Sequence, residues 1–158
     1  LAGAVVEFRA ALKVAEQWDF TQHRTMLLQN LGEALGNQGE AGESIQMLER
    51  SETMARYVGM DGILAESFRI RAEIQLAEKR YGEAERFARQ AVEAADATGA
   101  PRFQAAAQLV LARSLLATTD GEGRSGSGRD ALELAAALFE KSGILAQAEE
   151  IRAELASH

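Results

Sequence analysis

The chain has 158 residues, of which 47% are hydrophobic and 26% are charged, and this length and composition suit a single folded domain. Its formal net charge of −7 argues against nucleic-acid binding, which needs a clustered basic surface, and the absence of cysteine excludes disulfides and thiolate chemistry. No apolar run approaches the roughly 20 residues that a membrane-spanning helix needs, so we expect no contact with a membrane.

Helical spacing of the apolar residues predicts eight helices and no strands. Their expected ranges, in chain order, are 3–17, 21–38, 42–57, 61 onward, 82–97, 101 onward, 129–141 and 144–156. Asp19 or Thr21 is expected to cap the second helix and Asp61 the fourth, because short polar side chains accept hydrogen bonds from free backbone N–H groups. Gly59 and Gly99 are expected to end the third and fifth helices.

One connection differs from the short turns between the other helices. The segment GEGRSGSG, Gly121 to Gly128, is expected to insert about seven residues as a mobile surface loop, since glycine and serine favour flexible connectors. Its glycines also fit the GxGxxG spacing of a dinucleotide-binding turn. That turn works only between a strand and a helix, and no strand is predicted here, so we interpret the segment as a connector.

The chain repeats itself with an offset of 40 residues. Gly59 and Gly99 are related by this offset, and it also superimposes Leu31-Gly32 on Arg71-Ala72 and on Leu111-Ala112. Each copy has a helix, a short turn and a second helix. A period of this size indicates an array of helix pairs rather than a globule with one central core.

Small residues recur in the second helix of each copy, where two helices that cross closely leave no room for large side chains. They are Ser44, Ala84, Ala88, Ala91, Ala131 and Ala135. Together with the Leu-Gly step in NLGEALGNQGEAGESIQML and the RYGEAE turn before the fifth helix, this pattern resembles the tetratricopeptide (TPR) repeat. The resemblance covers nearly the whole chain, with repeats longer than the family's usual 34 residues, as in the helical sensor regions of bacterial regulators.

The resemblance implies an all-α fold: a right-handed superhelical array of antiparallel helix pairs with eight helices. Residues 1–158 are then one repeat domain of a larger protein, since the chain starts at Leu1 rather than methionine. Its expected parts are the second helix of a truncated repeat (1–18), three repeats (19–60, 61–100 and 101–144) and a capping helix (145–158). Arg71 and Gln75 depart from the pattern, because the other two copies have leucine at both places.

No set of residues indicates catalysis. His23 has no His, Asp or Glu three or four residues further on, and His158 is terminal, so we expect no metal site, no cofactor and no enzymatic activity. The many carboxylates lie near arginines on helix faces and are typical of a solvated surface.

In the family, the first helices of the repeats line a concave groove that receives an extended peptide or a helix of a partner. Asn30 matches the place of an asparagine that holds ligand backbone there, although the other copies have Ile70 and Val110. The 40-residue offset puts positions 29, 69 and 109 in one row and positions 33, 73 and 113 in another. The candidate groove residues are Gln29, Asn30, Glu33, Arg69, Glu73 and Arg113. The alternative for the four charged residues is that they only bridge neighbouring repeats.

These observations predict a protein- or peptide-binding module of a cytoplasmic regulatory or signalling protein, with no nucleic-acid or membrane partner. The mechanism would be a preformed surface that fixes an extended ligand. The alternative is self-association through the N-terminal face, where Trp18, the only tryptophan, ends the first helix.

Overall fold

The computed structural model describes residues 2–18, 20–118 and 122–156, and within these ranges the chain forms eight α-helices and no strand. The helices are α1 (Ala2–Gln17), α2 (Thr21–Asn37), α3 (Ala41–Val58), α4 (Asp61–Ala77), α5 (Tyr81–Thr98), α6 (Pro101–Ala117), α7 (Glu122–Lys141) and α8 (Leu145–Ala156). The predicted all-α array is therefore confirmed. The 40-residue offset is visible in the helix bounds, since α2, α4 and α6 begin at residues 21, 61 and 101 and end at 37, 77 and 117.

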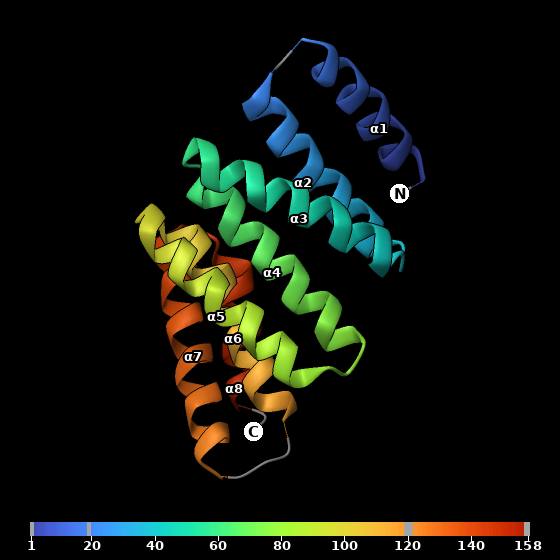
Figure 1. Ribbon diagram of the computed structural model, residues 1–158. Helices are drawn as coiled ribbons and strands as arrows, with labels where there is room; N and C mark the ends of the chain where they lie inside the picture. Colours follow the sequence, from blue (N-terminus) through green and yellow to red (C-terminus); the bar gives the residue numbers. More distant parts are fainter. Residues whose placement is uncertain (1, 19, 119–121, 157–158) are drawn as a thin grey trace.

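Consecutive helices pack as antiparallel neighbours along one array, with α1 and α8 at its opposite ends (Figure 1). The most extensive contacts join α2 to α3, α4 to α5, and α6 to α7. The first helices of these pairs also contact one another in order, α2 with α4 and α4 with α6, whereas in the described ranges α3, α5 and α7 make no mutual contact. Because the first helices lie closer together, they line the concave side of the array.

The glycines predicted to end two helices lie where expected, but the predicted N-cap residues do not. Gly59 and Gly99 follow α3 and α5 with φ of 70° and 63°, a left-handed conformation that glycine adopts without a clash. The predicted N-caps at Thr21 and Asp61 are wrong, because both are the first residues of their helices, and the preceding residues make no side-chain cap hydrogen bond. Asp19 lies outside the described residues.

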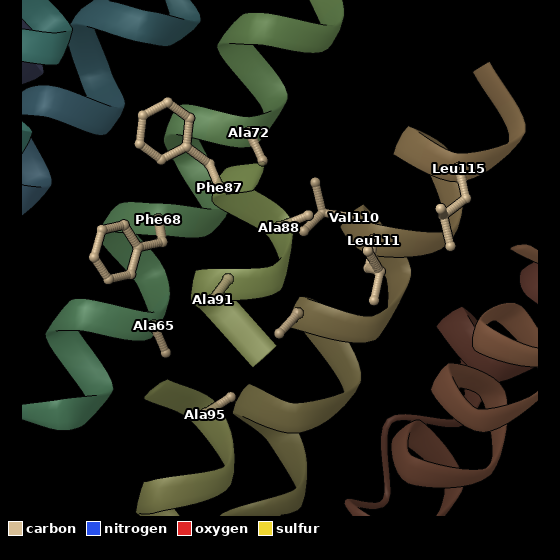
Figure 2. Packing of buried hydrophobic residues seen from close by; sticks show 11 residues of the cluster. Ala65, Phe68, Ala72, Phe87, Ala88, Ala91, Ala95, Val110, Leu111 and Leu115 are labelled. Carbon is tan, nitrogen blue, oxygen red and sulfur yellow. The ribbon is translucent and has the colours of Figure 1, made fainter. Parts of the chain in front are cut away.

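A cluster of buried side chains from α4, α5 and α6 forms the centre of the array (Figure 2). Phe68 of α4 and Phe87 of α5 stack with their ring centroids 6.5 Å apart. Ala88 and Ala91 of α5 are fully buried in the same cluster, as is Ala72 of α4. These small side chains let the two helices of the repeat approach closely, which is why alanine recurs along α5.

The loop expected over Gly121 to Gly128 is wrong for its described part. Helix α7 begins at Glu122, so residues 122–128 form about two helical turns, and Gly121 lies outside the described residues. Gly128 is buried, and a Cβ added to it would lie 2.7 Å from Cγ of Leu116 on α6. Glycine at this position makes room for a crossing helix instead of loosening a connector.

None of the helices in the described ranges combines the length and the apolar character needed to cross a bilayer.

Candidate functional site

A hollow of about 620 Å³ lies between α4, α6 and the turn from α7 to α8. We call it the α4–α6 groove. Its lining residues are Gly62, Ile63, Glu66, Arg69, Glu73, Arg102, Phe103, Ala106, Leu109, Val110, Arg113, Phe139, Ile144 and Gln147. Since α4 and α6 are first helices of neighbouring repeats, the groove belongs to the concave side.

Each of the two long walls of the groove is one stripe of a helix. On α6 the lining positions 102, 106, 109 and 113 are separated by four, three and four residues, the spacing that keeps side chains on one helical face. On α4 the stripe is 62, 66, 69 and 73, which the 40-residue offset maps onto the α6 stripe position by position. The repeat that builds the fold therefore also builds the two walls.

Arg69 on the α4 wall is held by three carboxylates from two helices. Its Nη2 donates to Glu33 Oε1 of α2 at 3.2 Å and to Glu66 Oε2 at 2.8 Å, and its Nη1 donates to Glu73 Oε1 at 2.7 Å. Burial alone would lower the pKa of Arg69, but the charges of Glu73 and Glu66 outweigh it and raise that pKa above its ordinary value. Arg69 thus ties α2 to α4, and its charge is met within the protein.

The two arginines on the α6 wall, unlike Arg69, have no carboxylate beside them in the described part of the chain. Helix α6 contains no acidic residue. Arg113 is exposed and has no hydrogen-bond, ion-pair or ring partner among the described residues. Arg102 is also exposed, and its guanidinium lies over the ring of Phe103, 4.3 Å from the centroid, without a carboxylate partner in the described part of the chain. Both positive charges are therefore available to a ligand.

A glycine shapes the end of the groove near Arg102. A Cβ added to Gly62 at the start of α4 would lie 3.0 Å from Cζ of Phe103. The ring of Phe103 consequently rests against the α4 backbone, and Arg102 in turn lies on that ring. This contact fixes one end of the α6 stripe against the opposite wall.

The structure brings some of the six predicted residues together and leaves others apart. Arg69, Glu73 and Arg113 line the α4–α6 groove. Glu33 reaches it through Arg69 and lines, with Glu73, a smaller hollow of about 190 Å³ between α2 and α4. Gln29 is buried and Asn30 is half-buried, and neither lines these two hollows. The contact between Glu33 and Arg69 joins neighbouring repeats, as in the bridging alternative, whereas Glu73 pairs with Arg69 within α4.

Sequence reasoning missed Glu66, Arg102, Phe103 and Phe139 in the lining. A signal for Arg102 was present, because it precedes Arg113 by eleven residues, which is close to three helical turns and keeps both on one face. Phe139 had no such signal, since it comes from α7, a second helix of its pair.

Comparison of the chain with models of known protein families gives no match, and comparison with curated proteins gives none either.

Proposed function

We propose that the chain is a TPR-like module of a cytoplasmic bacterial regulatory protein, and that it acts by binding a peptide segment of a partner protein in the α4–α6 groove. The observation that carries this proposal is the groove, with its volume of about 620 Å³ and walls from two neighbouring repeats. This volume lies within the range of about 300–1,000 Å³ that is typical of ligand sites.

The lining has the composition of a binding surface. Val110 and Phe139 are buried at its floor, Leu109 is half-buried, and Arg102 and Arg113 are exposed. An apolar floor with polar groups at the edge gives both contact area and orientation to a ligand. All residues that line the groove come from helices, except Ile144. Because helix packing holds their side chains in place before a ligand binds, less conformational entropy is lost on binding.

The test is selection of random dodecapeptides displayed on phage, followed by binding of the synthesised peptides to variants. Ala106→Trp places a large ring in the middle of the groove, whereas Ala137→Trp adds the same ring at an exposed site on α7 that is not part of the lining. We expect Ala106→Trp to weaken binding at least about tenfold and Ala137→Trp to leave it unchanged, with both variants folded by circular dichroism. Selected peptides that bind both variants equally well would place the binding site elsewhere.

Self-association is a second candidate, because one face of α1 is apolar and exposed. Val6 and Val14 of α1 are 67% and 55% exposed, and Trp18, directly after the helix, is 67% exposed. Their spacing in multiples of four residues puts them toward one side of α1. A second copy could cover this face with its own, in a symmetric contact. Sedimentation equilibrium should then show a dimer that Val14→Ser with Trp18→Ser converts to a monomer. A wild-type protein that stays monomeric at high micromolar concentration would exclude this function.

A further inference from the structure

The charges in the α4–α6 groove are divided between its walls. On α4, Arg69 is surrounded by Glu33, Glu66 and Glu73, which leaves no unmet positive charge on that wall. On α6, Arg102 and Arg113 have no carboxylate partner among the described residues. Three carboxylates share the single positive charge of Arg69, so the α4 side of the groove carries a net negative charge. The carboxylates of a ligand are therefore attracted to the two unpaired arginines of α6 and repelled by the α4 wall, which sets the side of the groove that they face.

From this division we infer that the ligand of the groove is an extended acidic peptide segment, with two carboxylate side chains paired to Arg102 and Arg113 and an apolar side chain between them. The inference rests on the proposed function, and it adds the chemical class of the peptide. The carboxylates belong to side chains within the segment, because the two arginines call for two separate acidic groups.

Helix geometry gives the spacing of these groups. Arg102 and Arg113 are eleven residues apart on α6, which corresponds to about 16 Å along the helix axis at about 1.5 Å per residue. An extended peptide rises about 3.3 Å per residue, so it covers this distance in about five residues. Successive side chains of an extended peptide point to opposite sides, so two carboxylates that both face α6 should be about four or six positions apart.

Between the two arginines the α6 stripe is apolar. Ala106 and Leu109 follow Arg102 along the same stripe of α6, and Ile63 faces the groove from the start of α4. These three side chains are half-buried, so part of their surface is still open to a ligand. A leucine- or phenylalanine-sized ligand side chain would bury this surface, which supplies affinity, while the flanking carboxylates select the sequence.

The overall charge of the chain makes salt dependence an unsuitable test. With a net charge of −7, the protein repels an acidic peptide at long range, while the two arginines attract it locally. Salt screens both effects, and the Debye length of about 8 Å at physiological ionic strength is shorter than the distance between the arginines. Variants of individual charges separate the local pairs from the long-range field.

The experiment uses the peptides selected on the wild-type chain and measures their Kd by fluorescence anisotropy. Arg102→Gln and Arg113→Gln should each weaken binding about fivefold, as expected for exposed ion pairs, and both together more than tenfold. The matched control is Arg89→Gln on α5, which removes an exposed arginine that pairs with Glu85 outside the groove. Changing the acidic peptide residue that pairs with Arg113 to lysine should abolish binding to the wild type. The same lysine peptide should bind the Arg113→Glu variant, because the charges of the pair are then exchanged.

The possible outcomes distinguish failure of the acidic ligand from failure of the peptide-binding function. Peptides that are rich in Asp and Glu, blocked by Ala106→Trp and weakened by both arginine variants support the acidic ligand. Peptides that are blocked by Ala106→Trp but bind Arg102→Gln with Arg113→Gln as tightly as wild type overturn the acidic ligand and leave the peptide-binding function standing. If no selected peptide is blocked by Ala106→Trp, the proposed function fails and this inference fails with it.

Discussion

Arg71 on α4 and Glu52 on α3 form a buried ion pair across the boundary between two repeats. Nη1 of Arg71 donates to both carboxylate oxygens of Glu52, at 3.1 and 3.0 Å, and the two side chains are only 13% and 5% exposed. Nη2 of Arg71 also donates to Glu49 at 3.0 Å, and the guanidinium lies 4.0 Å from the ring centroid of Phe87. Arg71 thus connects α3, α4 and α5.

This pair explains why Arg71 departs from the repeat pattern. The 40-residue offset relates Arg71 to Leu111, and it relates Glu52 to Val92. Leu111 belongs to the apolar cluster at the next repeat boundary, and Val92 is partly buried against that cluster. The ion pair and the apolar pair therefore occupy the same place in successive repeats. Both residues of the pair are charged at the first boundary, and both are apolar at the second.

The first prediction follows from this exchange. We expect Glu52→Val alone or Arg71→Leu alone to lower the free energy of unfolding by about 2–4 kcal/mol, because each leaves a buried charge without its main partner. The double variant reproduces the apolar pair of the next repeat and should be within about 1 kcal/mol of wild type, or more stable. Urea denaturation of the four proteins measures the coupling. Losses that simply add would show that the two side chains act independently.

The pH dependence of stability gives a second prediction. Burial raises the pKa of Glu52 above its ordinary value, and the opposing charge of Arg71 does not cancel this effect. The folded chain therefore keeps a proton on Glu52 at pH values where the unfolded chain has lost it. The contribution of this group to stability falls as the pH rises from its ordinary pKa through the raised one.

The double variant lacks this titration, so its stability relative to wild type should increase as the pH rises above the ordinary pKa of Glu52. Urea denaturation at a series of pH values measures the difference, with Glu49→Gln in both proteins so that the second carboxylate beside Arg71 does not titrate. A difference that stays constant with pH would show that the pKa of Glu52 is not raised.

The sequence predicted helix positions well because apolar spacing and end-marking glycines are local signals. It failed at residues 122–128, where the run Ser-Gly-Ser-Gly at 125–128 indicated a loop. Tertiary packing overrides this propensity, since Gly128 lies against Leu116 at the crossing of α6 and α7. The 40-residue offset contained the correct answer, because it maps Gly128 onto Ala88 inside α5 without any insertion.

Two glycines in this segment provide the third prediction. A Cβ at Gly126 would meet no atom within 4 Å, whereas a Cβ at Gly128 would lie 2.7 Å from Leu116 Cγ. Gly126→Ala should therefore raise the free energy of unfolding by up to about 1 kcal/mol through helix propensity. Gly128→Ala should lower it by about 1–3 kcal/mol through overpacking. Equal gains from both variants, measured by urea denaturation, would show that α7 does not pack on α6 at this point.

The fourth prediction concerns Lys79, which has a φ of 60° in the turn between α4 and α5. Its equivalent one repeat earlier is Gly39, with a φ of 84°. A side chain in this left-handed conformation is strained, so Lys79→Gly should stabilise the protein by about 0.5–1 kcal/mol and Gly39→Lys should destabilise it by a similar amount. Lys79→Ala serves as the control for loss of charge and should give no gain. If Lys79→Gly and Lys79→Ala changed the melting temperature equally, the backbone at residue 79 would not be strained by its positive φ.

The groove could be predicted only in part. The offset identified the rows that hold Arg69, Glu73 and Arg113, because helical repeats put equivalent positions side by side. It could not show that Arg69 turns toward Glu33 while Arg113 stays unpaired, since this depends on side-chain directions and on which helix has acidic neighbours. Pairing inside the protein, rather than position, distinguishes the charges that bridge repeats from those left for a ligand.

The last prediction tests the close crossing within a repeat. In the first complete repeat Leu48 of α3 packs against Gly32 of α2, where an added Cβ would lie 2.7 Å from Leu48 Cγ. The 40-residue offset maps this pair onto Ala88 of α5 and Ala72 of α4, both fully buried in one cluster (Figure 2). One large and one absent side chain thus occupy the space of two alanines.

Ala88→Leu alone should lower the free energy of unfolding by about 1–3 kcal/mol, because the larger side chain forces the two helices apart. Adding Ala72→Gly recreates the pair of the first repeat and should recover part of this loss, even though glycine in a helix costs about 1 kcal/mol relative to alanine. Urea denaturation of the two single variants and the double variant gives the coupling energy. A double variant that loses the full sum of the two single effects would show that Ala72 and Ala88 do not face each other.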